Sequence, residues 1–242
     1  RYGVVLRFKK RTGRVIGEGP NWITPLIEQI QLFPHELKTQ EIVVDVFCRD
    51  DVVVSVKGSV QYRPNKGLIL TFVEMSERAI EIGLSDAVES ELGKIAGEIE
   101  SSVFRQKRKI LETLINCILT LDRPPHFHIN PAKDGKTGEV IKGQFVMGES
   151  IVEWIESLNL VDPREENDLR DKLHPKKWEI LVRDGTIDLI EFYEKNLSRI
   201  NLMIKKGRGN SPIEELYGIY VNVYRLSDVS FGKELTAALQ KR

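Results

Sequence analysis

The stretch that decides the fold is EIVVDVFCRDDVVVSVKGSVQYR, residues 41–63. Its second half alternates strictly. One face carries Val52, Val54, Val56, Gly58, Val60 and Tyr62, and the other carries Val53, Ser55, Lys57, Ser59, Gln61 and Arg63. A period of two is typical of a β-strand with one buried and one solvated face. The first half, 42–47, is apolar except for Asp45 and is therefore predicted to lie deeper in the sheet. The polar link 48–51 predicts a hairpin or a close meander.

Further strands are predicted ahead of this stretch, at 2–8 and 29–33, with a basic, glycine-containing turn at 9–14. Between them, glycines and prolines make 17–27 a rigid loop that carries four apolar residues: Trp22, Ile23, Leu26 and Ile27. From the residues alone, the favoured interpretation is that these side chains plug one end of the sheet. The alternative is a surface loop that dips into a bilayer interface, where tryptophan is favoured.

The hydrophobic period then changes to three and four residues. It predicts an amphipathic helix at 72–96 and a second helix at 101–119, with Ser101 or Ser102 as its cap. Residues 121–212 differ in character: a strand is predicted at 140–147 and helices at 149–158, 163–173 and 187–206. This region is interpreted as a mostly helical insertion. It is held together by aromatic side chains: Trp154, Trp178, Phe192 and Tyr193.

The last strand is predicted at 217–226, where Tyr217, Ile219, Val221 and Val223 would share a face. A helix is predicted to begin at about Gly232 and to be still running at Arg242, which suggests that the natural protein continues. The chain begins at Arg1 without methionine or a signal peptide and so reads as part of a longer protein. A membrane anchor upstream is neither indicated nor excluded.

Composition indicates a globular protein and excludes several classes of function. Lys plus Arg and Asp plus Glu both number 36 in 242 residues, so there is no net charge to attract nucleic acid. Basic clusters, such as the one at 9–11, are interpreted as solvated faces. The two cysteines, Cys48 and Cys117, are predicted to be small buried hydrophobic residues in a reducing compartment. No apolar run approaches the roughly eighteen residues of a membrane span.

The sequence offers no active site, and neither a cofactor nor a metal is predicted. Gly135-Lys136-Thr137 resembles the end of a phosphate-binding loop, but Asn130 stands where that motif needs glycine. His126 and His128 could chelate a metal, yet no further ligand cluster accompanies them. Acidic residues are spread along helix faces, so no carboxylate pair is placed for acid–base catalysis.

The order of the motifs resembles the stomatin/prohibitin/flotillin/HflK-HflC family, whose shared domain is called SPFH or Band 7. Four landmarks carry the resemblance: GVVLRF at 3–8, GEGPNWITPLI at 17–27, TQEIVV at 39–44 and RDDVVVSVKGSVQYR at 49–63. Tyr217-Gly218-Ile219 and Asp228-Val229-Ser230 look like the closing strand of that domain. The resemblance covers 1–119 and 213–242. This chain departs from the family pattern in its insertion, in Tyr217 for the usual tryptophan, and in Phe231-Gly232-Lys233 for Leu-Pro-Glu.

The resemblance implies an α+β fold: a mainly antiparallel sheet packed with two helices. The domain would occupy 1–120, the insertion 121–212, and the closing strand with the start of a coiled coil 213–242. It also implies a non-enzymatic scaffold that forms homo-oligomers or hetero-oligomers with paralogues. Such subunits build membrane-associated rings or cages that organise lipids and proteins, are anchored through a segment outside this chain, and can enclose an AAA protease or regulate a channel.

Under this resemblance Trp22, Ile23, Leu26 and Ile27 become candidates for membrane contact. The wetter side of the 72–96 helix becomes a candidate oligomer interface: Glu77, Arg78, Glu81, Glu89 and Glu91. Two other functions stay open: a regulatory module that uses 121–212 to dock a partner, and a subunit of a vault-like soluble shell.

Overall fold

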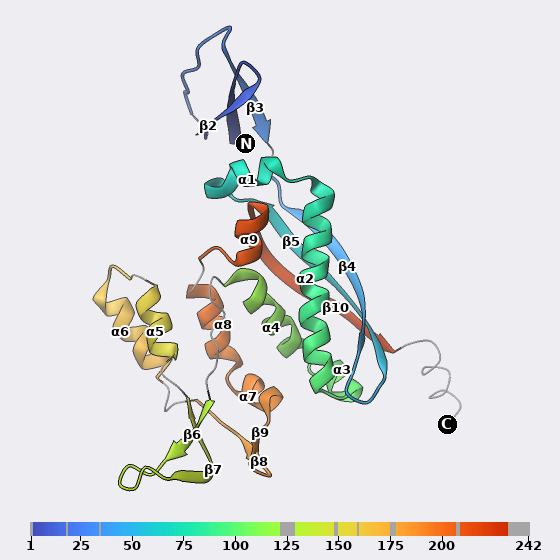
Figure 1. Ribbon diagram of the computed structural model, residues 1–242, viewed down its shortest axis with the longest axis vertical. Helices are drawn as coiled ribbons and strands as arrows, with labels where there is room; N and C mark the ends of the chain where they lie inside the picture. Colours follow the sequence, from blue (N-terminus) through green and yellow to red (C-terminus); the bar gives the residue numbers. More distant parts are fainter. Residues whose placement is uncertain are drawn as a thin grey trace. The chain divides into compact units, whose positions relative to one another are not determined.

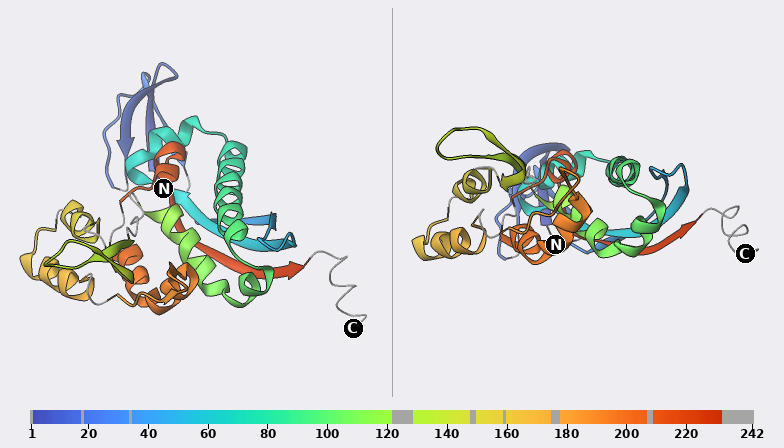
Figure 2. Two further views of the ribbon diagram at one scale, coloured as in Figure 1. Left: turned by 60° about the horizontal axis from the view of Figure 1, so that its bottom comes forward. Right: turned by 90° about the horizontal axis from the view of Figure 1, so that it is seen from below.

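The computed structural model describes residues 2–17, 19–33, 35–121, 129–147, 150–158, 160–174, 178–206 and 209–231. The chain divides into two compact units (Figure 1 and Figure 2). Unit 1 combines residues 1–120 with 210–242, and unit 2 comprises 121–209. The fold is α+β, with antiparallel sheets and several helices, as predicted.

The N-terminal sheet of unit 1 has the strand order β2-β1-β3, with β1 (Tyr2–Arg7), β2 (Lys10–Ile16) and β3 (Glu28–Phe33). The predicted basic turn at 9–14 is wrong, because the chain reverses within two residues and is a strand again from Lys10. Those two residues, Phe8 and Lys9, have φ angles of 51° and 66°. Two successive left-handed residues form the tight hairpin turn whose twist matches that of the flanking strands.

The main sheet has the order β10-β5-β4, with β4 (Lys38–Phe47), β5 (Val53–Pro64) and β10 (Ile219–Phe231). The predicted hairpin and the alternation along β5 are confirmed, since every second residue from Val54 to Pro64 is buried. The prediction that the first half lies deeper is wrong. β4 is an edge strand whose Val43 and Phe47 are 61% and 70% exposed, while β5 is central. β10 pairs with the edge of β5 that β4 leaves open. The local sequence does not reveal this pairing, because the two strands are far apart in the chain.

α2 (Glu77–Glu98) and α4 (Arg108–Thr120) pack against this sheet (Figure 1). The 3-10 helix η1 (Lys66–Leu68) and α1 (Ile69–Glu74) precede α2, and α3 (Ser101–Gln106) precedes α4. Each of the two predicted helices is broken once. Ser76 ends the first break by capping α2, its hydroxyl accepting from the Ala79 amide at 3.1 Å. The second break falls at Lys107.

The start of α3 is capped from the β4–β5 link and not by a serine of its own. The Asp50 carboxylate accepts from the Ser101 amide at 3.2 Å and from the Ser101 hydroxyl at 2.7 Å. These bonds tie the end of the hairpin to the helix layer. Ser101, predicted as a cap, is instead the donor that Asp50 holds.

The closing strand begins at a helix-to-strand junction. Tyr217 was predicted to start the strand, but it ends α9 (Pro212–Tyr217). Gly218 then has φ +65°, and a Cβ there would lie 2.2 Å from the Phe72 amide nitrogen. Only glycine combines that backbone conformation with that close approach. The Tyr-Gly-Ile landmark is therefore a packing requirement between α9 and α1.

Two polar side chains hold β10 in register. The fully buried Glu214 carboxylate accepts from the Val221 amide at 2.6 Å. Asn116 of α4 pairs with Tyr224, accepting from its amide at 2.8 Å and donating to its carbonyl at 2.9 Å. A register shift between Val221 and Val223 moves Tyr224 into the core, so the predicted face is wrong from that point. The helix predicted from 232 lies outside the described residues.

Unit 2 contains β6 (Ile129–Lys133), β7 (Val140–Met147), α5 (Ser150–Ser157), α6 (Pro163–Lys172), β8 (Val182–Arg183), β9 (Thr186–Ile187), α7 (Leu189–Lys195) and α8 (Leu197–Lys206). The predicted strand and helices are present, whereas the partner strand β6 and the small hairpin β8–β9 were not predicted. The last predicted helix breaks at Asn196, which is buried and hydrogen-bonds the Glu179 backbone in both directions. Trp178 stacks on Phe192 at 5.9 Å in the core.

We expect Asp50→Ala to destabilise unit 1 by about 1 kcal/mol at neutral pH, because loss of a helix cap costs about that much. The hydrogen bond from the Ser101 side chain lowers the pKa of the Asp50 carboxyl below its ordinary value. Its contribution is therefore present above the unfolded pKa and is lost as pH falls through the folded pKa. Urea denaturation against pH should show the difference from wild type shrinking in acid. Asp45→Ala, at an exposed site, is the control, and an equal loss there would contradict the capping role.

Two glycines of α2 should respond oppositely to alanine. A Cβ at Gly83 would lie 1.9 Å from the Tyr217 hydroxyl, whereas nothing lies within 4 Å of one at Gly93. Gly93→Ala should stabilise by roughly 0.5–1 kcal/mol through helix propensity. Gly83→Ala should destabilise by roughly 1–3 kcal/mol through overpacking. Equilibrium unfolding in urea measures both, and a stabilised Gly83→Ala variant would refute the contact.

Candidate membrane-contact and assembly surfaces

The loop that connects β2 to β3 is built by hydrogen bonds. The Asn21 side chain donates to the carbonyls of Gly17 and Gly19 at 3.0 and 2.9 Å. The Glu28 carboxylate accepts from the Thr24 amide at 2.9 Å. The Phe8 amide donates to the Ile27 carbonyl at 3.1 Å, which joins the loop to the β1–β2 turn. The loop leaves β2 at Ile16, which pairs with Gly3, and reaches the β1–β2 turn only at Ile27, so it runs along the N-terminal sheet from one end to the other. We call the turn together with this loop the apolar end.

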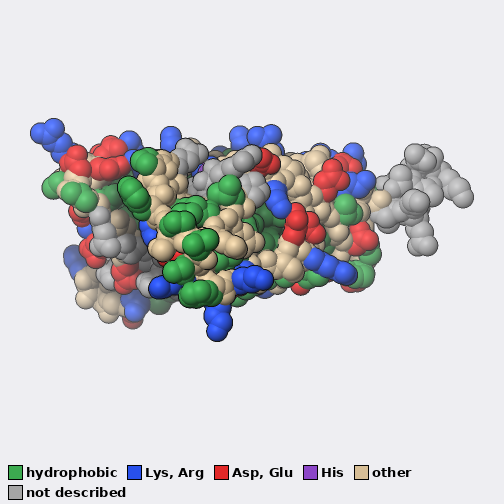
Figure 3. Space-filling view, turned by 90° about the horizontal axis from the view of Figure 1, so that it is seen from above, with side chains coloured by type: hydrophobic (Ala, Val, Ile, Leu, Met, Phe, Trp, Pro, Cys, Tyr) green, Lys and Arg blue, Asp and Glu red, His purple; other side chains and the backbone are tan. Residues whose placement is uncertain are grey.

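The structure places the four predicted loop residues in two groups. Trp22 is 89% exposed and Leu26 is fully exposed, while Ile23 and Ile27 are half-buried. The interpretation that this loop plugs the sheet is therefore wrong for Trp22 and Leu26. Phe8, at 72% exposure, joins them and was not predicted, because its position in a two-residue turn was not recognised. Seen from above, hydrophobic side chains gather over the N-terminal sheet, with basic side chains around them (Figure 3).

Backbone strain accompanies this exposure. Phe8 and Leu26 have φ angles of 51° and 75°, in the left-handed region that costs a residue with a Cβ about 1–2 kcal/mol. Burial within unit 1 does not offset this conformational cost for Leu26, because its side chain is fully exposed. The two-residue turn accounts for the conformation of Phe8, whereas strained residues such as Leu26 are enriched at functional sites. This geometry presents apolar side chains at the surface, where an apolar partner can bury them.

The candidate interface residues lie on α2, and two of them, Glu77 and Glu81, lie close to β4 of the main sheet. Glu77, Arg78, Glu81 and Glu89 are exposed and Glu91 is half-buried. Two of them already have partners: Glu77 pairs with Lys38 at 2.5 Å and Glu91 with Lys94 at 2.6 Å. Ile82 is 50% exposed on the same helix and was not predicted. Among the described residues Arg78, Glu81 and Glu89 form no ion pair. Arg78 and Glu81, together with the exposed Ile82 beside them, are called the α2 patch.

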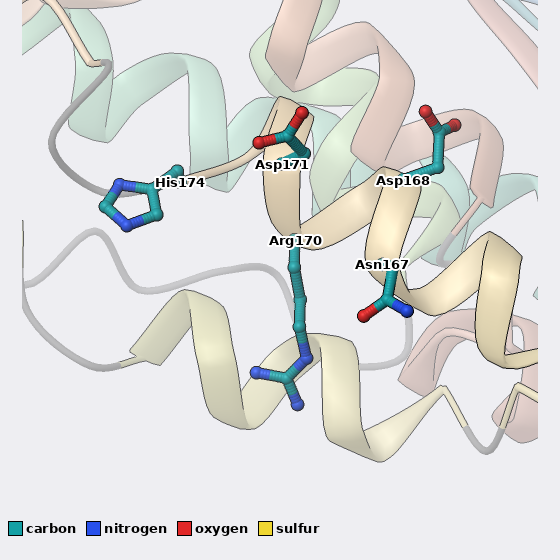
Figure 4. Close-up of a pocket in the computed structure, with 5 residues that line it drawn as sticks. All are labelled: Asn167, Asp168, Arg170, Asp171 and His174. Carbon is teal, nitrogen blue, oxygen red and sulfur yellow. The ribbon is translucent and has the colours of Figure 1, made fainter.

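Two cavities are lined by described residues. A cavity of about 240 Å³ in unit 1 is lined mainly by apolar side chains, including Phe33, Tyr62 and Phe72, with the Lys38–Glu77 pair. A larger one of about 500 Å³ lies along α6 in unit 2. Its lining side chains point in different directions (Figure 4): Asn167, Asp168, Arg170, Asp171 and His174.

The other chemical candidates have structural roles where the chain is described. Gly135-Lys136-Thr137 lies in the β6–β7 turn, where the Asp134 carboxylate accepts from the Lys136 amide at 2.7 Å. His126 and His128 lie outside the described residues. Among those described, no cluster of His, Cys, Asp and Glu could hold a metal.

Both cysteines are buried and unpaired, as predicted. Burial raises the pKa of Cys48 to about 11, helped by the nearby Asp50 charge, and that of Cys117 to about 12. Their thiols are therefore protonated at neutral pH. They act as small apolar side chains in the core.

Across the described ranges, no helix is both long and apolar enough to span a membrane. The sequence model of the SPFH domain / Band 7 family matches residues 1–242. No curated protein matches the chain. Proteins of this family are generally membrane-associated, non-enzymatic scaffolds and regulators. With the landmark strands, the Gly218 junction and the full-length match in agreement, the chain belongs to the SPFH domain / Band 7 family.

Proposed function

We propose that this protein is a scaffold subunit whose apolar end inserts into a membrane interface and whose α2 patch contacts a neighbouring subunit. Rings or cages built this way would organise lipids and membrane proteins, a membrane protease among them. The observation that carries the proposal is the exposure of Phe8, Trp22 and Leu26, two of which, Phe8 and Leu26, also have left-handed backbone conformations. Aromatic and aliphatic side chains that are exposed in the protein become buried when they enter a bilayer interface, and this burial favours binding.

The membrane arm of the proposal has a built-in probe. Of the three tryptophans, Trp154 and Trp178 are each 6% exposed and Trp22 is 89% exposed. On binding to lipid vesicles, Trp22 should move to a less polar environment, so the emission spectrum should shift to the blue. Brominated lipids should quench that emission.

We expect Trp22→Ser/Leu26→Ser to lower the vesicle partition coefficient at least tenfold. Full burial of such side chains contributes about 1.5–3 kcal/mol each, and interfacial burial recovers part of that. Vesicle co-sedimentation measures the change. The matched control is Val161→Ser/Leu189→Ser, which removes exposed apolar side chains of unit 2. Unchanged partition of the Trp22/Leu26 variant would refute membrane insertion by this loop.

The assembly arm rests on the free charges of the α2 patch. We expect Arg78→Glu/Glu81→Arg to reduce the size of assemblies formed by the full-length protein in detergent, because complementary contacts become like-charge contacts. Sedimentation velocity and negative-stain imaging report the size. Glu139→Arg/Lys142→Glu, in the β7 hairpin, is the control. Assemblies of wild-type size in the α2 variant would count against this surface.

A further inference from the structure

We infer that the apolar end selects anionic lipid headgroups, an inference that rests on the proposed membrane contact. The basis is a charge asymmetry that the neutral total conceals. Residues 1–33 hold six basic and two acidic side chains, a net of +4, while the whole chain sums to zero. The remaining 209 residues therefore carry a net of −4.

Basic residues lie next to the exposed apolar ones, either along the chain or through a hydrogen bond. Lys9 follows Phe8 in the two-residue turn, and Lys10 starts β2 directly after it. Arg14 donates to the Trp22 carbonyl at 2.9 Å, which places a guanidinium against the loop that carries Trp22 and Leu26. All three basic residues are exposed.

Little local negative charge competes for them. In the described part of residues 1–33, Glu28 is the single acidic residue, and its carboxylate already accepts from the Thr24 amide. Arg11 is engaged by α1, donating to the Val73 carbonyl at 3.1 Å and lying 3.9 Å from Glu74. Lys9 and Lys10 form no ion pair with any described residue. Their ammonium groups are available to an external anion.

The geometry favours a lipid surface over an acidic protein or a nucleic acid. Phe8, Trp22 and Leu26 would be buried by an apolar phase, and Lys9 and Lys10, one and two residues after Phe8, would meet anions at its boundary. An anionic bilayer provides both at the right depths, since long basic side chains reach the headgroups while their neighbours enter the acyl region. The attraction acts within a Debye length of about 8–10 Å, so it operates only once the apolar residues are at the interface.

The test compares the 242-residue chain on vesicles of phosphatidylcholine alone and with about 30 mol % phosphatidylserine. Wild type should bind the anionic vesicles more tightly, and raising salt from about 0.1 to about 0.5 M should remove most of the difference. Lys9→Gln/Lys10→Gln should lose about 25-fold on anionic vesicles, at roughly fivefold for each lysine, and little on neutral ones. The control is Lys133→Gln/Lys136→Gln, an exposed pair in the β6–β7 hairpin.

The outcomes separate the two proposals. Equal binding to both vesicle types would overturn the anionic selectivity and leave membrane insertion standing. If the Lys133/Lys136 control lost as much binding as the Lys9/Lys10 variant, net charge alone would explain the loss, and the anionic selectivity would also be overturned. Binding to neither vesicle, with capture of a soluble acidic polymer such as polyglutamate, would overturn both.

Discussion

The pairing of β5 with β10 is the constraint on which unit 1 depends. It joins segments from opposite ends of the chain, and the whole of unit 2 lies between them in the sequence. Three polar or conformational devices hold it: the left-handed Gly218 against α1, the buried Glu214 carboxylate on the Val221 amide, and Asn116 on Tyr224. Without this ladder β5 would have one neighbour, and α4, which packs on β10, would lose its support. An insertion of about ninety residues is compatible with this because loop-closure entropy grows slowly with length.

The apolar residues of the apolar end differ in exposure and backbone conformation from most apolar residues of unit 1. In the main sheet and its helices most apolar residues are buried, although Val43 and Phe47 on the edge strand and Ile82 on α2 are exposed. At the β1–β2 turn and the following loop, apolar residues occupy strained backbone positions and face outward. A local conflict of this kind between conformation, burial and side-chain type is expected at functional sites, and it supports the proposed membrane contact. The fold and the proposed contact with lipid are thus separable parts of unit 1.

Sequence periodicity predicted the β4–β5 hairpin, the helical layer and most elements of unit 2. Several of its errors share one cause, which is that breaks and edges depend on distant contacts. The helix predicted over 187–206 breaks at Asn196, whose side chain hydrogen-bonds the Glu179 backbone seventeen positions earlier. The break before α2, where Ser76 caps the helix, and the two-residue turn at Phe8 and Lys9 are instead local features that periodicity does not show. For the candidate site, the residue types Trp22 and Leu26 were visible in the sequence. Their exposure, and the role of Phe8 beside them, were not.

By itself the sequence determined the family landmarks, the alternation of β5, the helical periods and the position of the insertion. These are local properties, since side-chain period and turn chemistry are written in consecutive residues. The tertiary structure decided which strand is central, why Tyr217-Gly218-Ile219 is a helix-to-strand junction, and which side chains of the apolar end face outward. Those outcomes depend on what packs against each residue from elsewhere in the chain. No window of neighbouring residues contains that information.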